Sequence, residues 1–360
     1  MGRATRQRLR LKRALTGAFA LLLAACAAEP LQREQWSVFG SQAELSLPAN
    51  TPAADREKSA RVLAALWQQR ERDWHAWNTS TLTEFNTALQ ADGEADAPIA
   101  LRGLLAQSRL LQKESQGWFD PGIGRLVAMW GFHTSDYPVR TPAPSSAALD
   151  AWAERPDSLR QLRCDAAWKC RTGNRDVQLD FNAIAEGLAL HEGAQALRAA
   201  GIAHALLNLG GDVLALGRNQ SAEWRVGIDD SEGGVLGGVS LRDGEALMSS
   251  GRYAKYRESS AGERRPHVLN PFTGQPETSA RLSVVLHTDP ARADAAATAL
   301  LAAGPRHFAT VVQSMHLGCA LLVDTEGRAW VTRSMADRFE WEREVPEAAR
   351  IDAGEGCGTR

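Results

Sequence analysis

The 360-residue chain carries 41 basic and 43 acidic side chains, a formal net charge of −2, and 44% of its residues are hydrophobic. Its length is sufficient for one large domain or two small domains with a sizeable core. The acidic excess makes nucleic acid a poor partner, because a surface that binds phosphate backbones needs clustered positive charge.

The first 25 residues are typical of a secretory signal. Six basic and no acidic side chains accompany Ala14–Ala25, an apolar run of about a dozen residues that is too short to span a bilayer. The run ends at Cys26, and the small residues before this cysteine resemble a bacterial lipobox. We therefore expect cleavage before Cys26, a lipid anchor on its thiol, and a periplasm-facing position in the bacterial cell envelope, on the inner or the outer membrane. The alternative is an ordinary signal peptide cut near Ala28. Removing residues 1–25 would leave 35 basic and 43 acidic residues, a net charge of −8.

Helical and strand patterns follow a polar tether over residues 26–35. Asp55–Trp74 and Ile99–Ser115 have the periodicity of amphipathic helices. The other elements predicted in the first half are a strand over Trp36–Leu47, a short helix starting within Thr81–Asn86, loops over Ala91–Pro98 and Pro138–Ser146, and a strand over Val177–Asp180.

The second half mixes helices and short strands without strict alternation, which favours an α+β fold over a doubly wound sheet. We expect one domain over residues 36–332 and a loose polar tail over residues 333–360. The elements predicted here are helices over Ile184–Ala200, Ala293–Ala303 and Ala309–Met315, strands over Ala205–Leu209, Glu245–Ser250, Val268–Asn270 and Leu282–Leu286, one hairpin formed by Val213–Arg218 and Trp224–Asp229, and a last hairpin formed by Cys319–Val323 and Ala329–Thr332.

Two cysteines flank a possible hairpin turn. Cys164 and Cys170 are six residues apart and match no zinc-binding pattern. An exported chain would meet an oxidising compartment, where a disulfide is allowed. A disulfide and two unpaired thiols both remain compatible with this spacing.

The stretch from Leu179 to Gly187 combines a carboxylate with a turn of small residues. Asp180 ends an apolar run, and small side chains follow where a backbone can approach a ligand closely. Carboxylates and backbone groups together suit a phosphate-bearing ligand held through a metal. The alternative is an aspartate that only caps a turn.

Asp294 and Thr298 are four residues apart at the start of a predicted helix, so their oxygens share one face. A carboxylate and a hydroxyl are hard oxygen ligands that suit Mg²⁺. The alternative is that Thr298 packs in the core while Asp294 only stabilises the helix N-terminus.

His267 begins the block H-V-L-N-P-F-T-G. Beside a metal-bound diphosphate, a histidine can accept a hydroxyl proton at neutral pH, so we interpret His267 as a general base. A purely structural histidine is the alternative. The rings of Phe39, Trp77 and Trp118 could stack on a planar ring system of a ligand, or they could pack in the core.

Five blocks occur in the order typical of the ApbE family, the FAD:protein FMN transferases, which the chain resembles over about Trp36–Thr332. They are Gly117–Phe132, Leu179–Gly187, Leu247–Tyr253, Arg265–Pro276 and the stretch that contains Asp294 and Thr298. The resemblance implies a single mixed α+β domain with mostly antiparallel sheets.

The resemblance also implies site residues. Metal ligands would be Asp294, Thr298 and the backbone carbonyl of Ala183. Glu186 stands where the family carries lysine or glutamate; a glutamate cannot neutralise phosphate and would instead accept a hydrogen bond or order a water. The residues expected to bind FAD are Phe39, Trp77, Trp118, Phe119, Asp120, Asp180, Glu186 and Leu269.

The implied reaction is transfer of the FMN moiety of FAD to a threonine or serine hydroxyl of an acceptor protein, with release of AMP and with Mg²⁺ or Mn²⁺ as the metal. The implied acceptors are FMN-carrying subunits of membrane redox complexes. Three alternatives remain from the sequence. The first is an FAD pyrophosphatase that releases FMN and AMP, the second is a flavin-binding lipoprotein without catalysis or a redox flavoprotein, and the third is a structural envelope lipoprotein that binds no flavin.

Overall fold

The computed structural model describes residues 31–230, 234–342, 344–353 and 356–357. The predicted signal peptide, Cys26 and the first part of the tether lie outside these residues. The chain from Leu31 onward forms one compact unit. Within its described residues, no helix is both long enough and apolar enough to cross a membrane.

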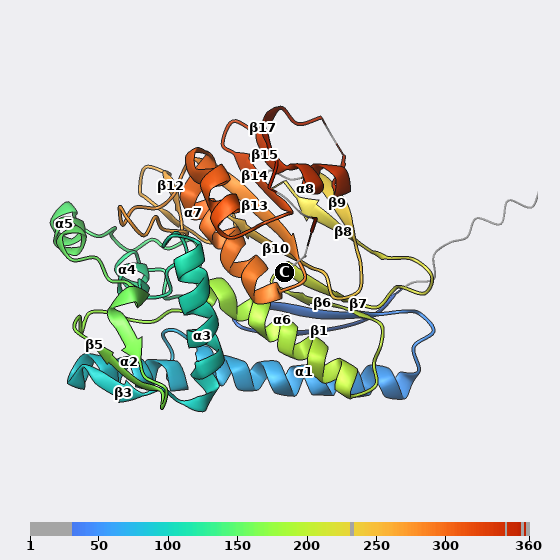
Figure 1. Cartoon of the computed structure of the whole chain (residues 1–360), viewed down its shortest axis with the longest axis horizontal. Coiled ribbons are helices and arrows are strands. Elements are labelled where there is room, and N and C mark those ends of the chain that lie inside the picture. The colour runs from blue at the N-terminus through green and yellow to red at the C-terminus, as the bar shows by residue number, and fades with distance from the viewer. Residues whose placement is uncertain (1–30, 231–233, 343, 354–355, 358–360) are drawn as a thin grey trace, which may run out of the picture. The chain divides into compact units, whose positions relative to one another are not determined.

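The main sheet of this unit has nine strands (Figure 1). Neighbouring strands are antiparallel except for the last pair, β15 and β17, which is parallel. In spatial order the strands are β1 (Gln32–Val38), β2 (Ser41–Leu47), β6 (Ala205–Leu209), β7 (Asp212–Leu216), β10 (Ala246–Gly251), β13 (Ala280–His287), β14 (Ala320–Asp324), β15 (Ala329–Thr332) and β17 (Glu347–Ile351).

Strand β13 shows why this sheet is covered on both faces. All eight of its residues are buried. Successive side chains of a strand point to opposite faces. Val285 therefore packs in the larger hydrophobic core, whereas Leu282, Val284 and Leu286 pack in a second core on the other side.

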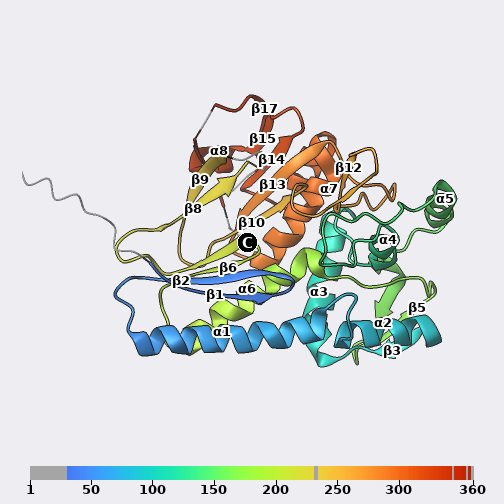
Figure 2. The ribbon, with the colours of Figure 1, turned by 180° about the vertical axis from the view of Figure 1, so that it is seen from behind.

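Helices cover the face that carries the larger core. Helix α7 (Pro290–Ser314) packs on β10, β13 and β14, α6 (Asn182–Ala199) on β6 and β7, and α1 (Ala53–Trp74) on β1. Figure 1 shows α6 and α7 in front of the sheet, and Figure 2 shows the sheet from behind. Helix α3 (Ile99–Glu114) packs against α6 and α7. The close fit of α6 and α7 determines where the cleft described below can form.

The two helices predicted over Ala293–Ala303 and Ala309–Met315 are the halves of α7. Gly304 has φ 64° and ψ −176°, outside the helical region, and Pro305 follows it. The proline removes a backbone donor and the glycine tolerates the positive φ, so the helix bends at this point.

A small sheet covers the opposite face. It contains β8 (Trp224–Asp229), β9 (Val235–Leu241) and β16 (Glu340–Trp341). The predicted hairpin between Val213–Arg218 and Trp224–Asp229 is therefore wrong: β7 pairs with β6 and β10 in the large sheet, whereas β8 pairs with β9.

Two short strands predicted near the cleft are absent as strands. The backbone of Leu179 bonds the side-chain amide of Asn86, with both bonds at 2.9 Å, and the Asp180 N–H donates to the carbonyl of Pro121. A side chain thus replaces the neighbouring strand expected for Val177–Asp180. Val268–Asn270 forms a tight loop with a single bridge from Leu269 to Pro276.

The remaining elements form a lobe beside α3. They are α2 (Thr81–Asp92), α4 (Gly124–Met129), α5 (Ser146–Glu154), the 3-10 turn η1 (Leu159–Gln161), the sheet of β3 (Glu94–Asp96), β5 (Lys169–Thr172) and β4 (Leu162–Cys164), and the hairpin of β11 (Tyr256–Glu258) and β12 (Arg264–Pro266). Strand β3 lies within the predicted loop Ala91–Pro98.

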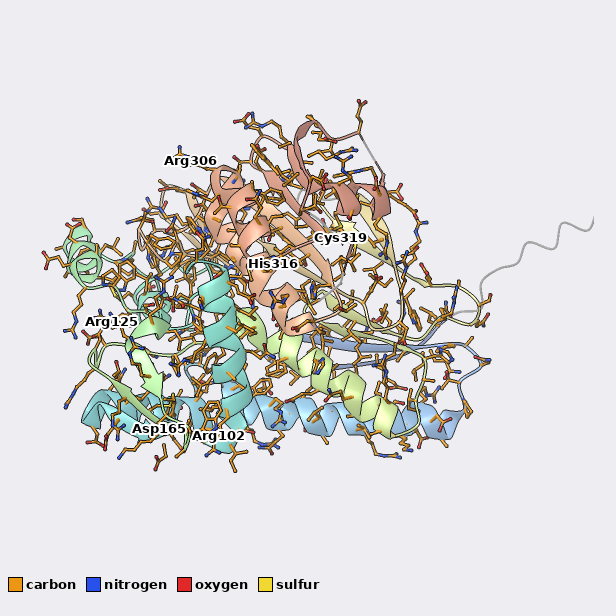
Figure 3. The ribbon with its side chains drawn as sticks, viewed as in Figure 1. Arg102, Arg125, Asp165, Arg306, His316 and Cys319 are labelled. Atoms are coloured by element: carbon orange, nitrogen blue, oxygen red, sulfur yellow. A yellow bond between two sulfur atoms is a disulfide. The ribbon has the colours of Figure 1, made fainter. Side chains whose placement is uncertain are left out.

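Cys164 and Cys170 form a disulfide, which settles the alternative left open by their spacing. They close the β4–β5 hairpin. Asp165 holds the turn between them by accepting hydrogen bonds from the N–H groups of Ala167 and Lys169, and Figure 3 shows it at the edge of the molecule beside α2.

Both ends of the predicted domain need correction. The predicted strand Trp36–Leu47 is a hairpin of β1 and β2 that turns at Phe39 and Gly40, both with positive φ, and β1 begins inside the expected tether.

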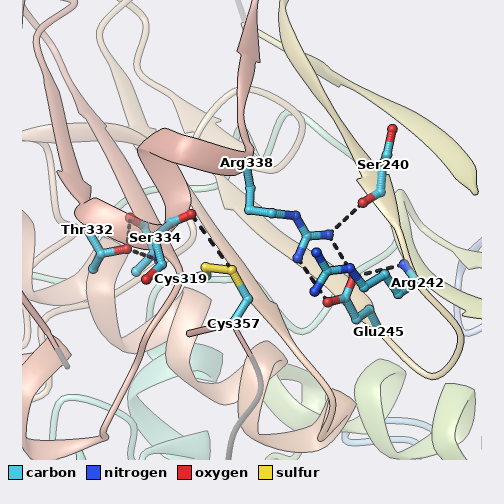
Figure 4. The surroundings of a disulfide bond; sticks show 9 residues. Ser240, Arg242, Glu245, Cys319, Thr332, Ser334, Arg338 and Cys357 are labelled. Atoms are coloured by element: carbon cyan, nitrogen blue, oxygen red, sulfur yellow. Dashed lines mark hydrogen bonds and ion pairs between the residues drawn. A yellow bond between two sulfur atoms is a disulfide. The ribbon is translucent and has the colours of Figure 1, made fainter. Parts of the chain in front are cut away.

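The predicted loose tail is also structured: it contains α8 (Arg333–Arg338), β16 and β17. A disulfide joins Cys319 to Cys357, and Arg338 of α8 bonds both carboxylate oxygens of Glu245 and the Ser240 carbonyl (Figure 4).

Candidate active site

A cleft of about 370 Å³ opens where α6, α7 and β10 meet the loops that flank α4. This volume is typical of small-molecule sites. All twelve residues singled out from the sequence line it: Phe39, Trp77, Trp118, Phe119, Asp120, Asp180, Ala183, Glu186, His267, Leu269, Asp294 and Thr298.

A close approach of two helices positions the proposed metal ligands. A Cβ on Gly187 of α6 would lie 2.4 Å from the Pro290 carbonyl oxygen and 2.8 Å from the Asp294 Cβ, so a glycine is required there. The Gly187 N–H donates to Asp294 Oδ2 at 2.8 Å. In a regular helix this N–H points toward the carbonyl of residue 183. The Ala183 carbonyl and the Asp294 carboxylate therefore lie close together at one end of the cleft.

Thr298 lies one turn beyond Asp294 on α7, and its Oγ1 is 3.1 Å from Ser250 Oγ of β10. The expected oxygen set thus shares one cavity wall, contributed by α6 and α7. Carboxylate, hydroxyl and carbonyl oxygens match the preferences of Mg²⁺ and Mn²⁺.

Two buried carboxylates, on Asp212 and Asp294, and the half-buried carboxylate of Glu186 crowd this wall. Burial, and then the charge of Glu186, raise the pKa of Asp294 to about 8. Burial also raises the pKa of Glu186, and burial together with Asp294 and Glu186 raises the pKa of Asp212. Like charges held together out of water are relieved by a bound cation, so the donor set fits a divalent metal.

The described residues contain no cluster of three or more His, Cys, Asp or Glu side chains arranged to hold a metal ion. The proposed metal site therefore depends on the Asp294 carboxylate together with the Thr298 hydroxyl and the Ala183 carbonyl. Sequence reasoning missed Asp212. Its signal was the G-G-D turn after β6, where Asp212 Oδ1 accepts a 2.7 Å bond from the Ser249 N–H.

His267 is held in one tautomer. Its Nδ1 is 3.0 Å from the Lys255 carbonyl, which can only accept, so Nδ1 carries the proton of the neutral ring. Its Nε2 is then the free acceptor. Burial, followed by the charge of Lys255, lowers the pKa of His267 to about 4, and the ring is neutral at physiological pH. This state is the one that can accept a proton.

Asp180 and Trp77 belong to one cluster. Asp180 Oδ1 accepts from the Asn182 N–H at the start of α6, and Oδ2 is 3.1 Å from His133 Nε2. The Trp77 ring stacks on His133 at 5.5 Å with an interplanar angle of 19°, and His75 contacts the Trp77 ring edge-on at 4.5 Å. The two histidines were missed because a lone histidine carries no spacing signal.

The aromatic residues divide into two groups. Phe119 is only 1% exposed and packs in the main core, and Leu269 packs in a smaller core with Leu126 and Trp130. Trp118 instead packs edge-on against Phe272 at 4.7 Å and lies 4.9 Å from His307. Phe272 is 52% exposed, which places this pair toward the mouth of the cleft.

Asp120 lines the cleft, but its carboxylate is already occupied. Oδ1 accepts from the N–H groups of Gly122 and Leu159, and Oδ2 accepts from Ser158 Oγ and Gln112 Nε2, at distances from 2.5 to 3.1 Å. Four donors saturate two carboxylate oxygens. The side chain of Asp120 therefore joins the α3, α4 and η1 segments that shape the cleft wall.

Comparisons with known proteins identify the family of this chain. A family scan matches residues 39–323 to the ApbE family. A FAD:protein FMN transferase of Rhodobacter capsulatus is 37% identical over 310 residues, which are 85% of this chain, and the chain spans only 58% of that relative. A FAD:protein FMN transferase of Escherichia coli K12 is 28% identical over 79% of this chain and 82% of its own length.

Solved structures show the same fold. A crystal structure of an ApbE protein from Thermotoga maritima superposes with a TM-score of 0.76 and 21% identity over 88% of this chain and 100% of that one. The apo flavinyl transferase ApbE of Pseudomonas stutzeri gives a TM-score of 0.71 and 25% identity over 87% of this chain and 98% of that one.

Proposed function

Because the chain belongs to the ApbE family, we propose that it transfers the FMN moiety of FAD to a threonine or serine hydroxyl of an acceptor protein. The observation that carries this proposal is the single cleft lined by the oxygen set on α6 and α7, by His267 and by the aromatic residues. A phosphoryl-transfer site needs a cation for the phosphate oxygens, a base for the nucleophile and a surface for the ring system.

Each residue has a role in this reaction. Asp294, Thr298 and the Ala183 carbonyl would hold Mg²⁺ or Mn²⁺, which would neutralise charge on the diphosphate oxygens. His267 Nε2 accepts the proton of the acceptor hydroxyl. That oxygen forms a bond to the phosphorus on the FMN side, the phosphorus–oxygen bond to AMP breaks, and its electron pair leaves with AMP.

The aromatic residues bind the ring systems of FAD. Trp77, backed by His133, presents a stacking face, and Phe39 and Trp118 lie on other parts of the cleft wall. The Asp180 carboxylate is held beside Trp77 by His133, where it can accept hydrogen bonds from the flavin nucleotide.

The decisive experiment incubates the purified protein with FAD, Mg²⁺ and a candidate FMN-carrying subunit of a membrane redox complex. We expect the acceptor to gain the mass of an FMN moiety, with in-gel flavin fluorescence and one AMP released per acceptor. Release of free FMN and AMP with an unlabelled acceptor would identify a pyrophosphatase instead. Intact FAD in every reaction would leave only flavin binding.

We further propose that the protein is lipid-anchored through Cys26 in the bacterial envelope and faces the periplasm. The basic and apolar leader before Cys26 supports this location. Two disulfides also support it, since disulfides persist in oxidising compartments. Metabolic labelling with a fatty acid should mark the wild-type protein in the membrane fraction and should not mark Cys26→Ser.

A further inference from the structure

The cleft is poor in positive charge for a site that takes a diphosphate. Its described lining residues include five carboxylates, on Asp120, Asp180, Glu186, Asp212 and Asp294, and Lys255 is the one lysine or arginine among them. A single metal ion held by this wall would neutralise its own carboxylate ligand as well as charge on the diphosphate. A second positive group beside the diphosphate would favour binding of the anionic FAD.

Lys255 lies beside His267 because the β11–β12 hairpin sets their register. Tyr256 pairs with Pro266, so the next pair along the ladder is Lys255 and His267. The Lys255 carbonyl accepts from the His267 N–H at 3.1 Å and contacts His267 Nδ1 at 3.0 Å. The backbone of Lys255 thus positions the proposed base, and its side chain starts from the same point of the cleft wall.

The ammonium group is available for a ligand. Lys255 is exposed, and in the described part of the chain its Nζ has no ion-pair or hydrogen-bond partner. Its charge acts both on the acidic wall and on His267: it lowers the pKa values of Glu186, Asp212 and Asp294, and also that of His267. Lys255 lines the same cleft as His267 and the acidic wall, so its ammonium group is within the cavity that would hold the transferred phosphoryl group.

We propose that the Lys255 ammonium binds the diphosphate of FAD directly, opposite the metal ligands Asp294 and Thr298. This inference rests on the proposed function. A lysine ammonium interacts with phosphate as a point charge on a flexible side chain. Lys255 can therefore approach the diphosphate after FAD has bound. The backbone carbonyl of Lys255 has a separate role, because it fixes the tautomer of His267.

The test compares Lys255→Gln with Lys255→Arg and with a control, Arg252→Gln. Glutamine removes the charge but keeps the backbone carbonyl on His267. Arg252 is another cation of the same loop; its Nη1 donates to the Thr278 carbonyl, and its side chain does not line the cleft. Binding of FAD, ADP and riboflavin is measured with Mg²⁺ present and without acceptor, by flavin fluorescence or calorimetry.

We expect Lys255→Gln to weaken FAD and ADP binding roughly tenfold to a hundredfold, the range for a hydrogen bond to a charged group, and to leave riboflavin binding unchanged. Lys255→Arg should recover most of the affinity, and Arg252→Gln should match the wild type. The acidic limb of the pH–rate profile should also move upward in Lys255→Gln. Of the charged groups facing His267, this change removes the ammonium of Lys255 and leaves the carboxylate of Asp180.

If Lys255→Gln and the wild type bind FAD and ADP with equal affinity while the wild type still labels its acceptor, the assignment of Lys255 is overturned and the proposed function stands. An equal loss for riboflavin would also overturn the assignment, because the effect would then be structural. A wild-type protein that binds no FAD would overturn the proposed function together with this inference.

Discussion

Two groups of Lys255, its carbonyl and its ammonium, act on His267 in different ways. The Lys255 carbonyl fixes its tautomer, and burial with the Lys255 ammonium lowers its pKa to about 4. The ring accepts a proton only when neutral, so activity is present above this pKa and is lost as the pH falls through it.

We expect the acidic limb of kcat/KM to lie near pH 4 in the wild type. Replacing His267 by Asn should lower the transfer rate roughly 10²- to 10⁴-fold, the usual contribution of a general base, with FAD affinity retained. Single-turnover labelling of an acceptor across a pH series measures both. A variant with wild-type turnover would remove His267 from the mechanism.

Asp120 illustrates a site residue that acts through packing. Asparagine at this position would turn an NH₂ group toward donors that now meet a carboxylate oxygen. We expect Asp120→Asn to lower the free energy of unfolding by about 1–3 kcal/mol. Denaturant titration should show this loss, and the surviving folded protein should bind FAD normally. Asp150→Asn, at an exposed position of α5, is the matched control. A selective loss of FAD binding at unchanged stability would contradict this view.

At the scale of elements, the contact between α6 and α7 is the feature that builds the site. Gly187→Ala would push the new Cβ against backbone of Pro290, which cannot move aside cheaply. We expect a loss of about 1–3 kcal/mol from overpacking and a weaker affinity for Mg²⁺ or Mn²⁺, because Asp294 moves with α7.

The control for this change is Gly103→Ala in the middle of α3, where the nearest atom, on Leu188, is 4.0 Å from the new Cβ. Alanine favours a helix over glycine, so this variant should be neutral or up to about 1 kcal/mol more stable. Thermal unfolding and metal titration of both variants test the pair. Equal behaviour of the two would show that the α6–α7 contact tolerates a methyl group.

The ion pair between Arg338 and Glu245 joins α8 to the segment that precedes β10. Burial alone would raise the pKa of Glu245, but the hydrogen bonds from Arg338 and the Arg242 N–H hold it below its ordinary value. Glu245 is 4% exposed, so Arg338→Met would leave a buried carboxylate unpaired.

We expect Arg338→Met to cost about 3 kcal/mol of stability near neutral pH. Because folding lowers the pKa of Glu245, its ion pair contributes stability when the pH is above the pKa of the unfolded state. This contribution disappears as the pH falls through the pKa of the folded state. The difference in the free energy of unfolding between Arg338→Met and the wild type should therefore become smaller at acidic pH. Arg333→Gln, which breaks an exposed ion pair of the same helix with Asp352, should change stability by less than about 1 kcal/mol.

At the scale of the whole molecule, the acidic wall couples metal binding to stability. The pKa of Asp294 is raised to about 8, so the folded protein holds a proton that the unfolded chain has released above about pH 4. The unfolded state then binds fewer protons, and stability falls as the pH rises from about 4 to about 8. A divalent cation removes this cost.

We expect the Tm of the metal-free protein to fall across this pH range, and Mg²⁺ or Mn²⁺ to raise the Tm most at the alkaline end. Calorimetry with EDTA and with added metal measures the difference. Asp294→Asn should remove most of the dependence on metal. A Tm that is insensitive to metal at pH 8 would argue against a cation at this wall.

Local patterns in the sequence predicted much of this molecule. The periodicity of Asp55–Trp74 and Ile99–Ser115 identified two helices that the structure confirms, because amphipathic spacing depends only on the helix itself. The four-residue spacing of Asp294 and Thr298 likewise predicted that they share one face of a helix. The blocks that resemble the ApbE family identified residues that all line one cleft.

Only the tertiary structure decided which segments meet. The amide of Asn86 takes the place of a strand beside Leu179, and the Ser158 hydroxyl and the Leu159 N–H donate to Asp120. The β11–β12 register puts Lys255 beside His267. The polar C-terminal residues gave no sign that β17 would pair with β15. Each of these contacts depends on partners distant in the chain or on one ladder register, and short-range spacing carries no information about them. The sequence by itself therefore determined the residue types and local faces, whereas long-range packing decided their partners and their protonation states.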